Sequence, residues 1–167
     1  QLRDDVRSLG SELISMGCSG KHCVLIGAFS YQWALTYFAI LSVGGILVPL
    51  DSEWSAEDLA DTAFKADASF LFCDEDLSLK AEAIANKANL EASPVFLRAK
   101  ENERNLISLK AKGEMKFLKS PDSYFDVRID ADGLSLLVFT SGTTGKGKGV
   151  MLSQTAILSD LSDIIPY

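Results

Sequence analysis

Short apolar runs of strand length alternate with helical repeats through the first part of the chain, up to residue 97. The first helical repeat spaces its apolar residues four, three and four apart, at Leu2, Val6, Leu9 and Leu13. Strand and helix alternate four times with short connections, and we expect the strands at residues 23–28, 46–50, 69–73 and 94–97. This alternation is typical of parallel strands joined by right-handed crossovers. The sequence therefore predicts an α/β fold: a mostly parallel sheet with helices on both faces.

An uncharged stretch from residue 33 to residue 50 is long enough to raise the question of a membrane-spanning helix. Gly44, Gly45 and Pro49 interrupt it, and no Lys or Arg flanks it. We interpret residues 31–43 as a helix that is apolar nearly all round and therefore buried. A glycine stop and then a strand follow. The proline indicates either that it stands at an end of this strand or that the strand lies at an edge of the sheet. The sequence thus predicts no transmembrane segment.

The periodic signal weakens after residue 97. Residues 98–104 are rich in charge and indicate a solvated loop, whereas residues 106–118 predict a helix that is interrupted at Gly113. Residues 155–165 predict a last helix, with Pro166 just past its end. We expect one domain in which residues 1–130 form an α/β scaffold and residues 131–167 form a strand, a loop, a second strand and a helix.

A loop of glycines, hydroxyls and lysines follows the apolar run 134–139 and precedes a second short strand at 150–152. Its residues are Thr140, Ser141, Gly142, Thr143, Thr144, Gly145, Lys146, Gly147 and Lys148. Glycine lets backbone N–H groups converge on an anion, hydroxyls add donors, and lysines supply positive charge. The sequence therefore predicts a phosphate-binding loop. A plain glycine-rich turn with solvated lysines is the alternative.

Two kinds of phosphate loop can be compared with these residues. The Walker pattern GxxxxGK[ST] fits Gly142, Gly147 and Lys148, but Gly149 stands where a hydroxyl should ligate Mg²⁺. Residues 139–153 instead resemble the phosphate loop of the adenylate-forming superfamily, TSGTTGxPKGVxLSH in its common form, and residues 37–51 resemble an early segment of the same proteins. The superfamily includes acyl-CoA synthetases, luciferases and peptide-synthetase adenylation domains. The chain departs from the common form at Gly147, where proline is usual, and at Gln154, where histidine is usual.

The resemblance implies a ligase that attacks the α-phosphate of ATP with a carboxylate and then passes the acyl group to a thiol, usually that of CoA. It implies ATP, Mg²⁺ and CoA as cofactors, and a carboxylic acid, of the fatty type, as the substrate. Thr140 to Lys148 would hold the β- and γ-phosphates, with Thr143 and Thr144 as hydroxyl donors and Lys148 as the cation.

The resemblance also implies that the chain is a partial N-terminal domain of a longer enzyme. In the superfamily the Mg²⁺ ligands, the ribose-binding Asp and the catalytic lysine come later, and the C-terminal domain is mobile. We therefore expect no catalytic residue and no metal ligand in this chain, which would be inactive alone. We also expect exposed apolar surface and a two-fold homodimer.

Charge and cysteine content exclude several other functions. The net charge of −7 argues against a nucleic-acid partner, which requires a basic face. Cys18, Cys23 and the single His22 fit no common zinc spacing, and His22 has no triad partner. An odd number of thiols, three, is typical of a reduced cytoplasmic protein. Two alternatives remain: a nucleotide-binding or assembly module without catalysis, which Gly147 and Gln154 favour, and a peptide-synthetase adenylation domain.

Overall fold

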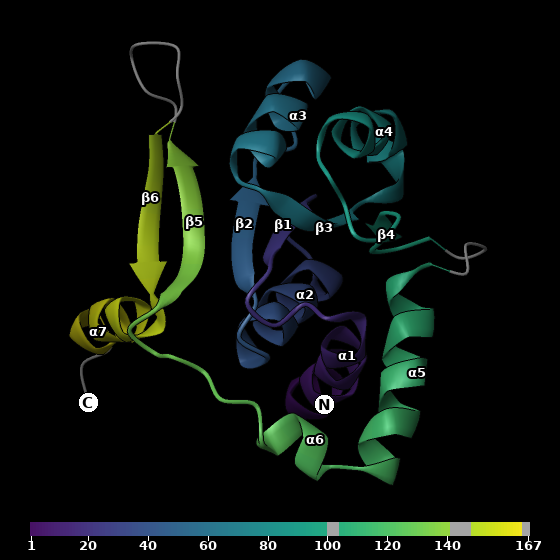
Figure 1. Cartoon of the computed structure of the whole chain (residues 1–167), viewed down its shortest axis with the longest axis vertical. Coiled ribbons are helices and arrows are strands. Elements are labelled where there is room, and N and C mark those ends of the chain that lie inside the picture. Colours follow the sequence, from purple (N-terminus) through teal and green to yellow (C-terminus); the bar gives the residue numbers. More distant parts are fainter. Residues whose placement is uncertain (100–103, 141–147, 165–167) are drawn as a thin grey trace.

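A six-stranded sheet forms the centre of the computed structural model, which describes residues 1–99, 104–140 and 148–164 (Figure 1). Its strand order is β4-β3-β1-β2-β5-β6. The strands are β1 (His22–Ile26), β2 (Ile46–Leu50), β3 (Ala68–Cys73), β4 (Val95–Phe96), β5 (Leu134–Thr140) and β6 (Lys148–Ser153). β1 to β5 pair in parallel, and β6 is antiparallel to β5. The mostly parallel α/β fold predicted from the sequence is confirmed.

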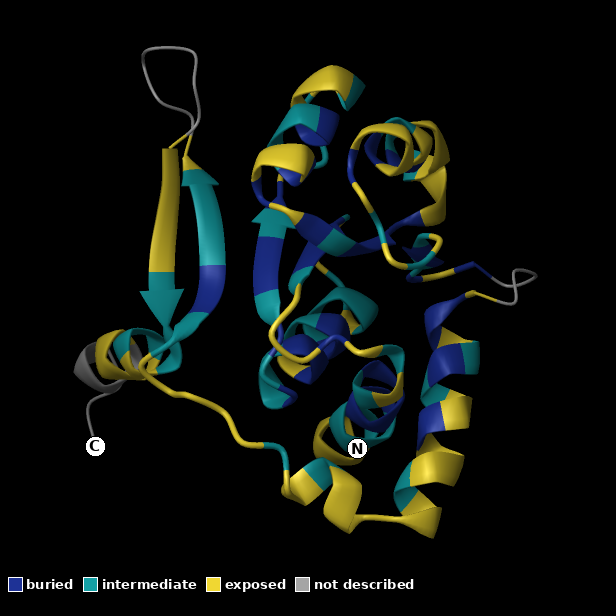
Figure 2. Ribbon diagram, in the orientation of Figure 1, coloured by how far each residue is buried: buried dark blue, intermediate teal, exposed yellow. Residues whose placement is uncertain are grey.

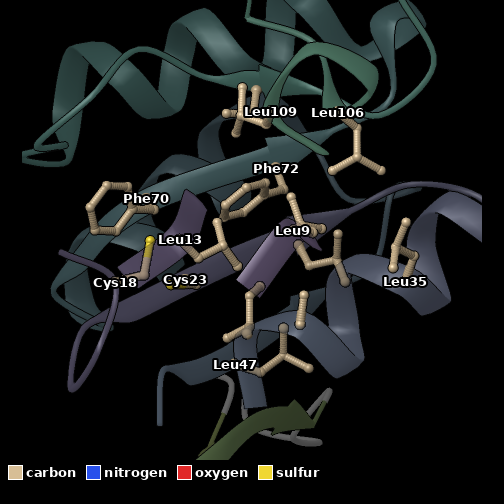
Figure 3. Packing of buried hydrophobic residues seen from close by; sticks show 14 of the residues in the cluster. Leu9, Leu13, Cys18, Cys23, Leu35, Leu47, Phe70, Phe72, Leu106 and Leu109 are labelled. Carbon is tan, nitrogen blue, oxygen red and sulfur yellow. The ribbon is translucent and has the colours of Figure 1, made fainter. Parts of the chain in front are cut away.

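Helices cover both faces of this sheet. They are α1 (Leu2–Met16), α2 (Tyr31–Ser42), α3 (Ala56–Lys65), α4 (Ser78–Lys87), α5 (Leu106–Lys119), α6 (Asp122–Phe125) and α7 (Gln154–Ile164), with a short 3₁₀ turn at Glu75–Leu77. One core lies between the sheet and α1, α2 and α5, where Leu9 and Leu109 pack with Phe72 (Figure 3). A second core lies on the opposite face, where α3 and α4 contribute Leu59 and Ile84. Central strands are buried on both faces, as a parallel sheet requires.

Local sequence signals explain where several helices begin and end. The Ser30 hydroxyl accepts a hydrogen bond from the Trp33 N–H (3.2 Å) at the start of α2. The Ser55 hydroxyl accepts one from the Asp58 N–H (3.1 Å) at the start of α3. α1 ends at Gly17, whose φ of 83° lies in the left-handed region that glycine adopts without strain.

The predicted interruption at Gly113 is wrong, because α5 continues through it. Gly113 is buried where α5 lies against α1, and a Cβ there would stand 1.8 Å from the carbonyl oxygen of Ser8. The residue therefore permits close packing of two helices and does not end one of them. The short helix α6 follows directly and was not predicted.

The expectation that α2 is buried all round is also wrong. Its inner face carries Leu35 and Ile40, but Tyr31 and Phe38 are exposed. α2 ends at Ser42 and β2 begins at Ile46, so the helix, glycine stop and strand are confirmed. No helix among the described residues is long and apolar enough to cross a membrane. Pro49 is the next-to-last residue of β2, at a strand end as predicted, although β2 lies inside the sheet.

The β5–β6 hairpin extends the sheet beyond the helices that cover β1 to β4 (Figure 1). β6 is the edge strand, and most of its length is exposed (Figure 2). Val150 and Met151 are exposed on it. The hairpin is therefore the part of the sheet that the helices bury least.

Candidate functional site

Two of the predicted site residues face each other across the hairpin. Thr140 is the last residue of β5, Lys148 is the first of β6, and the two are paired in the strand register. The Thr140 hydroxyl donates a 3.4 Å hydrogen bond to the carbonyl oxygen of Lys148, and both side chains are exposed. The remaining predicted residues, Ser141, Gly142, Thr143, Thr144, Gly145, Lys146 and Gly147, lie outside the described residues. The structure therefore brings together the two ends of the proposed phosphate loop.

Thr140 and Lys148, the described ends of the two hairpin strands, lie at the carboxyl edge of the parallel sheet. β5 runs parallel to β2, with Leu136 opposite Leu47, so Thr140 stands at the edge where β1 to β4 also end. In open α/β sheets, ligands bind outside this edge. His22 begins β1 and lies at the opposite edge.

A buried carboxylate occupies the same edge three strands away from β5. Asp74 directly follows β3 and is 2% exposed. Its oxygens accept hydrogen bonds from Arg98 Nε (3.0 Å), Arg98 Nη2 (2.6 Å) and the backbone N–H of Ala28 (2.9 Å). The hydrogen bond to Asp74, together with its charge, raises the pKa of the Arg98 guanidinium. A Cβ at Gly27 would lie 2.7 Å from the carboxylate, so only glycine lets the turn after β1 approach so closely.

This ion pair lies at the topological switch point of the sheet. The chain leaves β1 toward β2 on one side and leaves β3 toward β4 on the other, so the crevice forms between β1 and β3. Asp74 and Arg98 fill that crevice with an internal contact. The hairpin of β5 and β6 presents a further pair of exposed polar side chains at this edge, Thr140 and Lys148. Sequence reasoning missed both residues; an Asp directly after a buried strand was the available signal.

The departure from the family pattern at Gln154 has a structural role. The Gln154 side-chain amide donates a 3.1 Å hydrogen bond to the carbonyl oxygen of Leu41, near the end of α2. This bond ties the start of α7, and with it the base of the hairpin, to the helix layer.

The buried thiols are unsuited to nucleophilic or metal chemistry. Burial raises the pKa of Cys73 to about 12. The pKa of Cys23 is also raised, mainly by a hydrogen bond with Cys18 and to a smaller extent by burial. Both thiols are therefore protonated at neutral pH, and the thiolate is the reactive form. In the described part of the chain, no group of three or more His, Cys, Asp or Glu side chains is arranged to hold a metal ion.

The family model described as AMP-binding enzyme matches residues 1–166. The chain belongs to the AMP-binding enzyme family. This confirms the resemblance to adenylate-forming enzymes that residues 37–51 and 139–153 indicate. The phosphate loop predicted for this AMP-binding chain falls within the matched range.

Relatives and solved structures of AMP-binding enzymes are considerably longer. The chain is 28% identical over 175 residues to a long-chain-fatty-acid–CoA ligase of Mycobacterium bovis, covering 98% of the chain and 27% of that ligase. It is 28% identical over 163 residues to a D-alanine–D-alanyl carrier protein ligase of Streptococcus equi, covering 95% of the chain and 27% of that protein. The chain therefore spans about a quarter of the length of these relatives.

Two solved structures share the fold. A long-chain-fatty-acid–CoA ligase of Archaeoglobus fulgidus superimposes with a TM-score of 0.82 at 17% identity, over 98% of this chain and 31% of that one. ATP-bound MatB of Rhodopseudomonas palustris superimposes with a TM-score of 0.71 at 23% identity, over 96% of this chain and 30% of that one. At these identities the likeness is one of fold.

Proposed function

We propose that this chain supplies the ATP phosphate-binding loop of a carboxylate–CoA ligase that activates a fatty-type acid. The observation that carries the proposal is the β5–β6 hairpin, which presents Thr140 and Lys148 together at the carboxyl edge of the sheet. Membership of the AMP-binding family and the long-chain-fatty-acid–CoA ligases among the relatives support it.

The proposed chemistry has two steps. A carboxylate oxygen attacks the α-phosphorus of ATP, the bond to pyrophosphate breaks, and an acyl-adenylate forms. The thiol of CoA then attacks the acyl carbonyl, loses its proton, and AMP leaves. Negative charge builds on the phosphates in the first step, so donors and cations already in place lower its barrier.

Each part of the loop has a proposed role in that first step. Residues 140–148 hold the β- and γ-phosphates, with Thr143 and Thr144 donating hydroxyl hydrogen bonds and Lys148 supplying a positive charge. Mg²⁺, which neutralises phosphate charge when bound, would come with the ATP, since no described cluster of acidic side chains holds it. We assign no catalytic residue to this chain.

Because the chain spans about a quarter of its relatives, we propose that it is a partial N-terminal domain. Residues 1–130 are its scaffold and residues 131–167 carry the phosphate site, and the C-terminal domain belongs to the rest of the enzyme. Alone, the chain would form no adenylate. Its three cysteines are free and buried, which supports a reducing compartment, the cytoplasm.

A carrier-protein thiol is a second candidate acceptor. The Streptococcus equi relative, a D-alanine–D-alanyl carrier protein ligase, favours it. Transfer assays with labelled acid, CoA and a carrier protein distinguish the two acceptors.

Removing Lys148 tests the proposed site. An ammonium about 4 Å from a phosphate oxygen near the surface has a Coulomb energy of about 4 kcal/mol before desolvation. We expect a net loss of about 1–3 kcal/mol in Lys148→Ala, which weakens ATP binding about tenfold to a hundredfold. The measurement is an NMR titration of the isotope-labelled chain with ATP and Mg²⁺, in which we expect wild-type binding on the order of millimolar.

The matched control is Lys119→Ala, since Lys119 is an exposed lysine at the end of α5. Its titration should follow that of the wild type, with shift changes concentrated at the hairpin. Equal binding by Lys148→Ala and wild type would show that the loop is only a turn.

A further inference from the structure

The β5–β6 hairpin forms one unit with the start of α7 and the turn before β5. Thr155, the second residue of α7, donates from its backbone N–H (3.0 Å) and from its hydroxyl (3.1 Å) to the carbonyl oxygen of Ala131. Its hydroxyl also lies 2.7 Å from a carboxylate oxygen of Asp132. The Ser153 hydroxyl, at the end of β6, accepts a hydrogen bond from the Ala156 N–H (3.1 Å). These bonds all lie within the unit, so they hold it together without fixing it against the rest of the fold.

A side-chain hydrogen bond leaves this unit for the helix layer. The Gln154 amide donates to the carbonyl oxygen of Leu41 (3.1 Å), and the bond is partly shielded from water. Leu41 lies in the last turn of α2, where carbonyl oxygens have no partner within the helix, and its oxygen also accepts from the Gly44 N–H (3.2 Å). Gln154 thus connects the base of the hairpin to the C-terminal end of α2.

The apolar contacts of the hairpin are less directional. Leu137 and Phe139 pack against the core that α3 and α4 cover, and Val138 packs against the core on the other face. β5 meets β2 at one register position, with Leu136 opposite Leu47. Apolar packing holds the hairpin on the sheet but favours no single orientation, whereas a hydrogen bond weakens as its angle departs from linear. The tilt of the hairpin therefore depends on the bond at its base.

A small change of tilt at the base is a large displacement at the exposed end. Lys148 and Gln154 are six positions apart in the sequence, which is about 20 Å of strand at about 3.4 Å per residue. A rotation of about 5° at Gln154 would move Lys148 by roughly 1.7 Å over that length. A displacement of about 1 Å is enough to weaken the action of a binding or catalytic group severalfold or more.

We propose that Gln154 is a positioning residue of the phosphate loop, because its bond to Leu41 sets the tilt of the hairpin and with it the place of Thr140 and Lys148. This inference rests on the proposed function of the loop. Position 154 then requires an N–H donor of the right reach, which a histidine also carries at Nε2. The departure from the family pattern at Gln154 therefore keeps the donor, and it does not indicate a chain that has lost nucleotide binding.

The test measures the tilt directly. Residual dipolar couplings of the isotope-labelled chain report the orientation of the N–H bonds of β5 and β6 relative to those of β1 and β3. Gln154→Met keeps the length of the side chain and removes the donor, so we expect its hairpin couplings to change or to average toward zero. Gln154→His restores a donor and should restore the wild-type couplings. The matched control is Gln32→Met, the same chemical change in the first turn of α2, which should leave them unchanged.

The same variants are then titrated with ATP and Mg²⁺, and circular dichroism checks that each is folded. We expect Gln154→Met to bind ATP about threefold to tenfold more weakly than the wild type. Gln154→His and Gln32→Met should bind ATP like the wild type. Loss of binding in the methionine variant and its recovery in the histidine variant separate a donor that positions the loop from a side chain that only fills space.

Each other outcome overturns the proposal. Wild-type couplings in Gln154→Met would show that the bond does not set the tilt. Changed couplings with unchanged ATP binding would show that the tilt does not matter to the loop. A histidine variant that behaves like the methionine variant would show that a donor is not what position 154 requires. A wild type without any ATP-dependent shifts would refute the proposed function itself, and this failure is distinguishable because the couplings are measured without nucleotide.

Discussion

Gly113→Ala is expected to destabilise the fold, although alanine is the better helix former. At Gly113, α5 crosses α1 so closely that an added Cβ would lie 1.8 Å from the Ser8 carbonyl oxygen, 2.8 Å from its carbonyl carbon and 3.0 Å from the Glu12 nitrogen. All three are backbone atoms of α1, so no side-chain rotation relieves the overlap. The helices must move apart.

Two opposing terms decide the magnitude. Alanine is favoured over glycine in a helix interior by about 1 kcal/mol. A carbon–oxygen contact normally requires about 3.3 Å, so α5 would shift by roughly 1.5 Å. That shift loosens the packing of Leu9 and Leu109 in the shared core and lengthens the Lys116–Glu12 ion pair, now 2.6 Å, between the two helices. Overpacking of a core costs about 1–3 kcal/mol where side chains can adjust, and more where backbone must move, so we expect a net loss of about 2–3 kcal/mol.

Urea unfolding followed by circular dichroism measures this loss, and the melting temperature should fall by about 5–10 °C. Glu114→Ala is the control, because Glu114 is the next residue of α5 and is exposed. It reports the helix-propensity effect without the steric one and should change stability little. A Gly113→Ala variant as stable as the wild type would refute the close approach of α1 and α5.

Two further predictions concern charged contacts. Asp74→Ala leaves the Ala28 N–H and the Arg98 guanidinium without their acceptor. Because the Arg98 side chain is 48% exposed and can be rehydrated, we expect the free energy of unfolding, measured in urea, to fall by only about 1–2 kcal/mol. The control is Asp76→Ala, at an exposed position nearby, which should change that free energy little. Tyr31→Phe removes the hydrogen bond that is the largest cause of the lowered pKa of Asp5, so an NMR titration should find that pKa closer to its ordinary value of 3.8. Since the pKa of Asp5 is lowered in the folded state, this contact stabilises the fold at pH values above the ordinary pKa, and that stabilisation is lost as the pH falls through the lowered pKa. The stability of Tyr31→Phe should therefore fall less on acidification than that of the wild type.

Local patterns in the sequence were sufficient for the layered fold. The run Ile46–Leu50 and the glycine stop before it predict β2 at the residues where it lies, because both signals depend on neighbours in the chain. Gly113 was misread for the opposite reason. Helix propensity treats glycine as a weak point, whereas its position here is set by a contact with Ser8, more than 100 residues away in the sequence. The four-residue helix α6 is too short to show a period.

The exposed face of α2 shows a different limit. Trp33, Tyr37 and Phe38 made the helix look apolar all round, and apolar character alone predicts burial. How much of that surface is covered depends on which other helices and strands pack against α2, and the sequence of the helix does not show this. Asp74 and Arg98 were missed because they are 24 residues apart and meet only through the pairing of β3 with β4.

The position of the proposed phosphate loop depends on contacts at the base of its hairpin. β5 pairs with β2 through the single register position Leu47–Leu136, so the sheet alone holds the hairpin weakly. The Gln154 amide adds a bond to the end of α2, and the Thr155 hydroxyl donates to the Ala131 carbonyl (3.1 Å) just before β5. Both bonds act beside Ser153, at the end of the hairpin opposite Thr140 and Lys148. They hold the start of β5 and the end of β6, whereas Phe139, at the other end of β5, packs against the core that α3 and α4 cover. The exposed pair Thr140 and Lys148 is therefore positioned by the β5–β6 ladder together with this packing.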